Sequence, residues 1–382
     1  MTIKHQVAFL CLGFAFVFFA GCGSDSDSTT DTATTTEDTV VMRTLYLLSN
    51  AAGTNSVLAY TRDSSGGLEF LSETPTGGSG SGDNLNSTGN AIVLDTSTGL
   101  LFCVNAGSNS VSLFLVYSDG TVALLDTQNS RGVNPVSLAV YQNLVYVLNA
   151  GDGSTNPSIA GFQVSDGGLY FIEGSHQNLS TLTAAPTQID FAPTGTVLAL
   201  SEADSNQITS FLLDSNLAAY SRVSVASSGE GPAGIDFTSG GVLVCADGNP
   251  SVVDGGGVSS YQLTSSGNIS VISSSTANNQ TATSGVKVLA GGNSAVVSNS
   301  GSDSLSWYSI GSDGQINFTG TNVAAGGEPT ELAASEDEAY LYVLNRESDS
   351  ISAYEMTEAG FSLTPISGVD GLPSTVAGLT GW

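Results

Sequence analysis

Four residues of this 382-residue chain stand where side chains could do hydrolytic chemistry: Arg131, His176, Glu202 and Arg346. A histidine or a carboxylate can move a proton to or from a reacting group. Guanidinium groups bind carboxylates through paired hydrogen bonds and stabilise developing oxyanions. The simpler interpretation is that His176 is a solvated loop residue and that the other three form local ion pairs.

A second set of charged residues predicts a ligand site. Arg131, Glu230 and Glu328 each lie shortly before the proline of an apolar segment, and Arg346 follows a β-run that ends at Asn345. If the proline segments line a common axis, the loops before them converge there. Arg131 and Arg346 could then clamp a carboxylate between them.

Two oxygen-rich loops could attract calcium, which prefers oxygen ligands. They are 152–156, with the sequence Asp-Gly-Ser-Thr-Asn, and 247–250, with the sequence Asp-Gly-Asn-Pro. Neither has the spacing of a dedicated calcium loop, and Asp and Asn are ordinary turn residues. We therefore predict no metal site and no cofactor, with calcium as the alternative.

A repeated strand pattern must position these residues. Seven copies begin near Leu45, Leu101, Leu144, Val197, Val242, Ala295 and Leu341. In the last copy the segments 328–334, 339–345, 350–356 and 361–365 read as four strands rich in Val, Tyr, Leu and Ile, separated by turns. Ser-Asp-Gly turns at 118–120 and 312–314 suit tight hairpins. Four antiparallel strands at a period of roughly 45–55 residues predict an all-β, seven-bladed β-propeller over 44–382.

The two ends of the repeat region predict how the ring closes. The first copy enters at Thr44, which reads as the second strand of a blade, and lacks a proline segment before it. The segment 372–379, with the sequence Leu-Pro-Ser-Thr-Val-Ala-Gly-Leu, supplies the missing strand. We expect this C-terminal strand to complete the first blade and remove an exposed sheet edge. A β-solenoid or two β-sandwiches would leave the displaced strand unexplained.

The N-terminal segment resembles an export signal. An apolar run from Val7 to Ala20 is too short for a typical membrane span and predicts a signal peptide over 1–21. Phe19-Ala20-Gly21-Cys22 resembles the bacterial lipobox, which implies that Cys22 carries lipid and that the protein is anchored in the envelope, at the outer membrane of a Gram-negative bacterium. The region 22–43 then forms an acidic, disordered tether.

The remaining cysteines and the net charge exclude several functions. Cys103 and Cys245 occupy the same strand position of two distant blades, so we expect two buried thiols and no disulfide. The formal net charge is −28, with seven basic against 35 acidic residues. Nucleic acid is thus excluded as a partner, because binding phosphates needs clustered basic side chains. Membrane attachment would have to come through the lipid on Cys22.

The repeat motif resembles a known family. The sequence Leu-Tyr-Val-Leu-Asn at 341–345, followed by Asp-Ser-Ile-Ser-Ala-Tyr at 349–354, is similar to the seven-bladed lactonase family, which includes 6-phosphogluconolactonase, and to YVTN-repeat surface propellers. The resemblance implies the propeller fold over nearly all of 44–382. Enzymes of this family typically place histidines just after some of the prolines, whereas this chain has Ser137, Gln188, Gly234 and Glu331 there.

Three functional hypotheses follow from these features, and whether the protein is an enzyme stays open. The leading prediction is a lipid-anchored, monomeric binding or scaffolding protein that contacts an envelope protein or glycan through loops at the mouth of the propeller. The alternative is a lactonase-like hydrolase with a diverged active site. A calcium-assisted adhesion module is a third reading. Since basic residues are so few, a phosphorylated sugar acid would be a poor substrate.

Overall fold

The computed structural model describes residues 43–83, 85, 89–289, 291–357 and 362–381. The predicted signal peptide, Cys22 and nearly all of the tether lie outside these residues. Within them the chain forms seven antiparallel sheets and no helix. No helix there is long and apolar enough to span a membrane.

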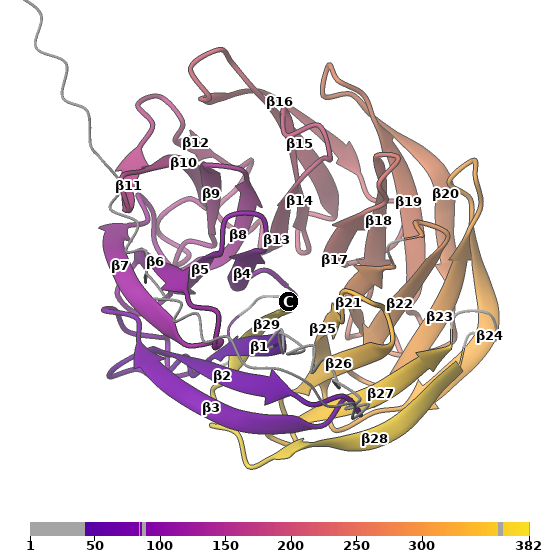
Figure 1. Ribbon diagram of the computed structural model, residues 1–382. Coiled ribbons are helices and arrows are strands. Elements are labelled where there is room, and N and C mark those ends of the chain that lie inside the picture. The colour runs from indigo at the N-terminus through magenta and orange to yellow at the C-terminus, as the bar shows by residue number, and fades with distance from the viewer. Residues whose placement is uncertain (1–42, 84, 86–88, 290, 358–361, 382) are drawn as a thin grey trace, which may run out of the picture. The chain divides into compact units, whose positions relative to one another are not determined.

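The seven sheets stand as blades around a central axis (Figure 1). Each blade contributes one innermost strand, and residues of these strands line a channel along the axis. In the order of blades 1 to 7 these strands are β29 (Ala377–Gly381), β4 (Ile92–Asp95), β8 (Pro135–Tyr141), β13 (Pro186–Phe191), β17 (Pro232–Phe237), β21 (Thr283–Val288) and β25 (Pro329–Ala334). The prediction of an all-β, seven-bladed propeller is confirmed.

The second strand of each blade is the most buried, because it lies between the faces of two neighbouring blades. β9, with the sequence Leu-Val-Tyr-Val-Leu-Asn, is buried at every position. The second strands are β1 (Arg43–Leu48), β5 (Leu100–Asn105), β9 (Leu144–Asn149), β14 (Val197–Glu202), β18 (Val242–Asp247), β22 (Ser294–Asn299) and β26 (Tyr340–Asn345). Near-continuous apolar runs are what such doubly covered strands require.

The third strand pairs with the second, and the fourth forms the outer edge. The third strands are β2 (Ser56–Arg62), β6 (Ser110–Val116), β10 (Ser158–Ser165), β15 (Gln207–Leu213), β19 (Gly257–Leu263), β23 (Ser304–Ile310) and β27 (Ser350–Thr357). The fourth are β3 (Leu68–Pro75), β7 (Val122–Asn129), β11 (Gly168–Phe171) with β12 (Gln177–Asn178), β16 (Ala219–Ala226), β20 (Ile269–Ala277), β24 (Ile316–Ala324) and β28 (Ser362–Asp370). In blade 3 the outer position is divided, because β11 and β12 both pair with β10.

The ring closes as predicted, with a shift in the closing strand. β29 pairs with β1, so that blade 1 combines the C-terminal strand with the first three strands of the described chain. The strand begins at Ala377 and not at Leu372, because the chain first makes a turn in which Val376 N donates to Pro373 O at 3.0 Å. Leu372 is nonetheless buried and packs in the core between blades 7 and 1.

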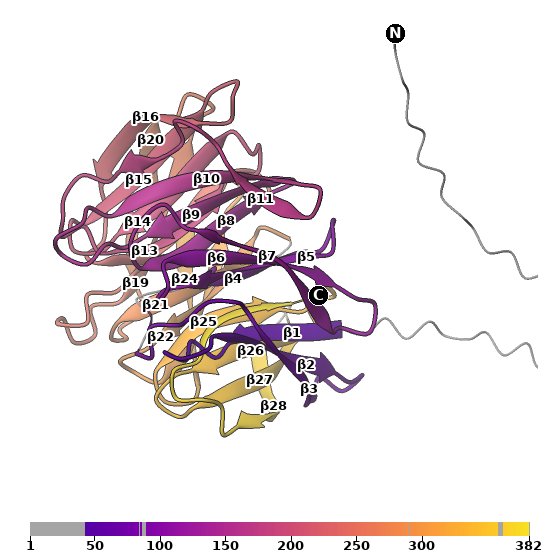
Figure 2. The ribbon, with the colours of Figure 1, turned by 90° about the vertical axis from the view of Figure 1, so that its left-hand side faces the viewer.

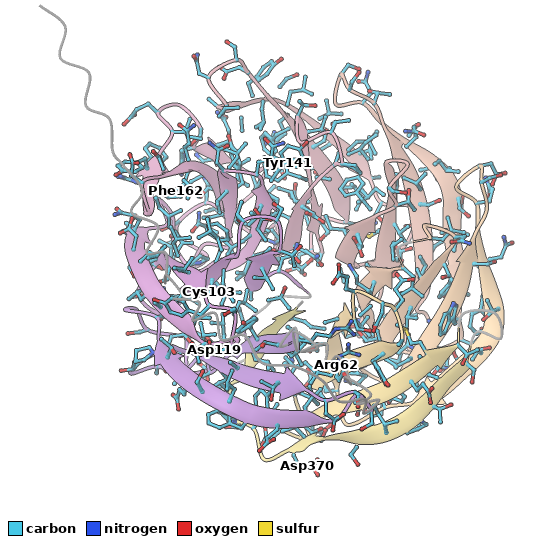
Figure 3. The ribbon with its side chains drawn as sticks, in the orientation of Figure 1. Arg62, Cys103, Asp119, Tyr141, Phe162 and Asp370 are labelled. Carbon is cyan, nitrogen blue, oxygen red and sulfur yellow. The ribbon has the colours of Figure 1, made fainter. Side chains whose placement is uncertain are left out.

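Both cysteines of the described residues are buried, as predicted. Cys103 lies in β5 (Figure 3) and Cys245 in β18, and both are free thiols with no exposed surface. Burial raises the pKa of each thiol, so neither is a thiolate nucleophile at neutral pH.

Candidate functional site

All first strands begin, and all second strands end, on the same face of the ring, which Figure 2 shows at the left. On this face lies the mouth cavity, a depression of about 690 Å³ with walls from blades 4 to 7. Its polar lining residues are Thr187, Asp204, Asn206, Glu230, Asn249, Ser284, Ser300, Glu328 and Arg346. The volume lies within the range of roughly 300–1,000 Å³ that is usual for pockets binding drug-sized ligands.

An ion pair between Glu328 and Arg346 forms one wall of the mouth cavity. Arg346 Nη2 donates to Glu328 Oε1 at 2.7 Å, and Arg346 N donates to Glu328 O at 3.0 Å. Arg346 Nη1 also donates to Leu85 O at 3.0 Å. These contacts fix the guanidinium plane, while both side chains keep partial exposure to the cavity. Two of the predicted ligand residues therefore meet, although 18 positions separate them in the chain.

The backbone at Glu328 explains why its side chain turns into the mouth. Glu328 has a φ of +54°, and its N–H donates to Asp303 Oδ1 at 2.9 Å. A non-glycine residue in the left-handed region needs such support from its surroundings. Asn134 and Ala185, at the same place before the prolines of blades 3 and 4, also have positive φ values. The conformation thus belongs to the blade-to-blade connection, and blade 7 uses it to present a carboxylate.

Glu230 lies on the opposite wall of the same cavity, in the connection from blade 4 to blade 5. Its Oε2 accepts a hydrogen bond from Asn249 Nδ2 at 3.3 Å. Asn206, the third polar residue here, accepts a hydrogen bond from Gly231 N through its Oδ1 at 3.0 Å. Three of the four predicted ligand residues, Glu230, Glu328 and Arg346, therefore line one cavity.

Arg131 and His176 lie elsewhere. The guanidinium of Arg131 stacks over the ring of Phe171 at 4.6 Å, on the outer strand of blade 3. His176 is exposed and lies between β11 and β12, also at the outer edge of that blade. Neither residue lines the mouth cavity, so the clamp that we predicted between Arg131 and Arg346 does not form.

Glu202 ends a second strand and is fully buried. Its two oxygens accept hydrogen bonds from the hydroxyls of Thr209 at 2.5 Å, Ser205 at 3.0 Å and Ser180 at 3.1 Å. The carboxylate is thus buried and hydrogen-bonded to hydroxyl groups, and it does not line the mouth cavity.

Buried polar residues recur at the end of six second strands, and we call these positions the clamp residues. Each bonds to the start of the third strand, to the connection that arrives from the preceding blade, or to both; for example, Asn105 Oδ1 accepts Thr76 Oγ1 of the connection at 2.6 Å, and Asn345 Nδ2 donates to Ser352 Oγ of the third strand at 2.8 Å. The clamp residues are Asn105, Asn149, Glu202, Asp247, Asn299 and Asn345, and all are buried. In Asp247, burial raises the pKa to about 7, and Oδ2 has no hydrogen-bond partner.

Beneath the mouth, the channel holds charged residues that our sequence reasoning missed. Lys287 Nζ donates to Asp236 Oδ2 at 3.1 Å, and both line an inner chamber of about 260 Å³ together with Asp190 and Glu331. Burial and the neighbouring Asp236 raise the pKa of Asp190 to about 7. The sequence feature that could have predicted Asp190 and Asp236 is an aspartate within an otherwise apolar first strand. It occurs in Gln-Ile-Asp-Phe at 188–191 and in Gly-Ile-Asp-Phe at 234–237.

Glu331 lines the inner chamber and also binds β29, the strand that closes the ring. Its Oε1 accepts Gly378 N of β29 at 2.9 Å, while the buried Oε2 has no partner. Burial raises the pKa of Glu331 to about 7, partly offset by Gly378 N–H and by the charge of Arg346.

The two loops considered for calcium form turns. Asp152 Oδ1 accepts Ser154 Oγ at 2.8 Å and Thr155 N at 2.7 Å, and Asp247 is a buried clamp residue. Among the described residues, no group of three or more His, Cys, Asp or Glu side chains is arranged to hold a metal ion.

Comparisons with known proteins agree with this architecture. A family model described as "Lactonase, 7-bladed beta-propeller" matches residues 251–377. No curated protein matches the chain. Among solved structures, a periplasmic gluconolactonase from Pseudomonas aeruginosa is similar with a TM-score of 0.71 at 16% identity, over 89% of this chain and 99% of that one.

Two further structures are similar to the same extent. A candidate 6-phosphogluconolactonase from Bacteroides fragilis has a TM-score of 0.70 at 18% identity, over 90% of this chain and 99% of that one. Another from Bacteroides uniformis has a TM-score of 0.69 at 15% identity, over 88% and 99%. At these identities the likeness establishes the fold, and function has to be argued from the site.

Proposed function

We propose that this protein is a lactonase-like hydrolase that opens uncharged sugar lactones in the mouth cavity. The observation that carries the proposal is the Glu328–Arg346 pair, which places a carboxylate and a guanidinium side by side in a concave site of a propeller. The family match over 251–377 includes Glu328 and Arg346, and the named gluconolactonase shares the fold. These findings favour hydrolysis over a purely scaffolding role.

The pair has the two functions that lactone opening needs. Arg346 would stabilise the oxyanion that develops on the lactone carbonyl oxygen, as fixed cationic donors do in acyl transfer. Glu328 would accept a proton from the attacking water. The water oxygen bonds to the carbonyl carbon, the ring C–O bond breaks, and the proton held by Glu328 passes to the departing ring oxygen. The product is the open hydroxy acid.

The charge of the mouth selects against anionic substrates. Asp204, Glu230 and Glu328 line the cavity together with a single arginine, Arg346. A phosphate group would meet an excess of negative charge, and burying like charges together is costly. We therefore expect a neutral lactone such as glucono-1,5-lactone to react faster than its 6-phosphate.

The experiment measures lactone opening by wild type, Glu328→Gln and Arg346→Met. Loss of a general base typically costs roughly 100- to 10,000-fold in rate, and we expect a loss in this range for Glu328→Gln. Glu347→Gln is the matched control, because Glu347 is exposed and directly follows Arg346. Circular dichroism would verify that each variant is folded.

Either of two results would contradict the proposal. Wild type could fail to open any lactone of the panel, or Glu328→Gln could keep the full rate while Glu230→Gln loses it, which would move the base to the other wall. If lactones bind without being opened, the protein is a binding module. Attachment through lipid on Cys22 to the envelope stays a prediction for either function.

A further inference from the structure

We infer that the mouth cavity continues into a second sugar subsite, so that the preferred substrate is a disaccharide lactone and not a monosaccharide lactone. This inference rests on the proposed function. It starts from a depression of about 500 Å³, the side groove, which runs outward from the mouth between blades 4 and 5. The side groove and the mouth cavity share three lining residues, Asn206, Glu230 and Asn249.

The two depressions meet at the hydrogen-bonded Glu230–Asn249 pair. This pair lies across the mouth from Arg346, since its residues come from blade 5 and its entry connection whereas Arg346 belongs to blade 7. A lactone ring held at Arg346 would point its far hydroxyls toward Glu230 and Asn249. A substituent on that side of the ring would pass directly into the side groove.

The groove wall is rigid. Ser228 N donates to the Tyr261 hydroxyl at 2.9 Å, and Ser228 Oγ accepts Ser275 N at 3.0 Å. On the other side, Val252 N donates to Asn249 O at 3.0 Å within the loop between β18 and β19. Gly256 N donates to Gln280 O at 2.7 Å, which ties the end of this loop to the connection after β20. A preorganised wall loses little entropy when a ligand binds.

The chemistry of the wall fits a sugar ring. The hydroxyls of Ser227, Ser228 and Ser275 alternate with the glycines at 229, 255 and 256 and with the short apolar side chains of Val252 and Ala277. Hydroxyl groups and small apolar surfaces match the two kinds of surface that a hexose presents. An acyl chain would need a continuous apolar wall, which the three serines interrupt, and Glu230 disfavours an anionic substituent.

The test blocks the groove without touching the Glu328–Arg346 pair. Ala277→Trp would place an indole in the side groove from an exposed position at the end of β20. Ala324→Trp is the matched control, because Ala324 holds in blade 6 the position that Ala277 holds in blade 5. Each is the last residue of the fourth strand and pairs with the first residue of the third strand of its blade. Ala324 lines a different depression, which has no residue in common with the mouth cavity.

Two readouts separate the subsite from the hydrolase. The first is kcat/KM for glucono-1,5-lactone and for its 4-O-hexosyl derivative, cellobionolactone. The second is calorimetric binding of the corresponding lactams, which are neutral and resist hydrolysis. For wild type we expect kcat/KM and the affinity for the lactam each to be about tenfold higher with the disaccharide than with the monosaccharide. A tenfold ratio corresponds to about 1.4 kcal/mol of additional interaction free energy.

We expect Ala277→Trp to remove this preference while the monosaccharide values stay unchanged, and Ala324→Trp to leave both substrates unaffected. If no lactone is opened but the disaccharide lactam still binds with a preference that Ala277→Trp removes, the hydrolase proposal fails and the subsite stands. Equal values for the two sugars in wild type would overturn the subsite. So would a preference for an alkyl-substituted lactone that Ala277→Trp abolishes.

Discussion

Depth within the ring decides what each carboxylate of this protein can do. Glu328, Glu202 and Glu331 have the same side chain, yet Glu328 pairs with an arginine in the mouth, Glu202 is satisfied by three hydroxyls, and Glu331 keeps one buried oxygen without a partner. Sequence reasoning selected the first two from their positions beside strand ends. It could not rank them, because only the neighbours across the blade interface show which carboxylate is already satisfied.

Asp247 is the clamp residue whose charge is least compensated. Four of the six clamp positions hold asparagine, whose amide can donate where a carboxylate cannot. Asp247→Asn should therefore stabilise the protein by about 1–3 kcal/mol at pH 8, the usual cost of an unsatisfied buried group. The measurement is urea unfolding of both proteins at a series of pH values.

The pH dependence has a definite sign. The pKa of Asp247 is raised in the folded state from 3.8 to about 7, so the folded protein holds the proton more tightly than the unfolded chain. The stability that this provides is complete below pH 3.8 and is lost as the pH rises through about 7. The advantage of Asp247→Asn should thus grow between pH 4 and pH 8. Asn299→Asp, at the same position of blade 6, should destabilise the protein, and this loss of stability should grow over the same pH range. If the difference in free energy of unfolding between Asp247→Asn and wild type is the same at all pH values, this account is contradicted.

At the level of the elements, four of the connections between blades carry a glycine that packs on a clamp residue. A Cβ added at Gly326 would lie 2.6 Å from Asn345 Cγ, and one added at Gly78 would lie 2.6 Å from Asn105 Cγ. The connection must pass this close for the clamp side chain to bind it. The glycines therefore set the distance between successive blades.

Gly326→Ala should lower the free energy of unfolding by about 1–3 kcal/mol, because the buried Asn345 has no room to move away. Gly53→Ala serves as the control, since an added Cβ there meets no atom within 4 Å. Thermal unfolding of the two variants beside wild type measures the difference. Equal midpoints for the two variants would show that the close approach carries no strain.

At the scale of the whole molecule, stability depends on the contact between the two ends of the described chain. β29 covers the free edge of β1, and Ala377 and Leu379 are buried in the adjoining cores. Gly378 N also satisfies Glu331 of blade 7. The last strand thereby joins blades 7, 1 and 2.

Removal of residues 377–382 should cost more than about 4–5 kcal/mol, the upper range for single substitutions, because an innermost strand is lost and a sheet edge is exposed. Leu379→Ala should cost about 2–5 kcal/mol, as a buried leucine truncation does. Thermal unfolding with light scattering would report both the loss of stability and edge-to-edge aggregation. A truncated chain that unfolds at the temperature of wild type would refute the role of β29.

The blades, their number and the closure of the ring could all be predicted from the amino-acid sequence. Strand alternation and turn residues are local properties, and the displaced segment after Leu372 could be matched to the incomplete first repeat from the sequence order alone. The burial of Cys103 and Cys245 followed from the same pattern, since equivalent positions of a repeat have equivalent surroundings.

Which charged residues share a cavity became clear only from the folded ring. Arg131 and Arg346 were both predicted to reach the mouth, yet Arg131 stacks on Phe171 at the outer edge of blade 3, whereas Arg346 pairs with Glu328 in the mouth. The direction of such side chains depends on the backbone conformation of each connection and on neighbours from other blades. Asp190, Asp236 and Lys287 meet in the channel for the same reason: the ring brings together innermost strands that lie about 50 residues apart.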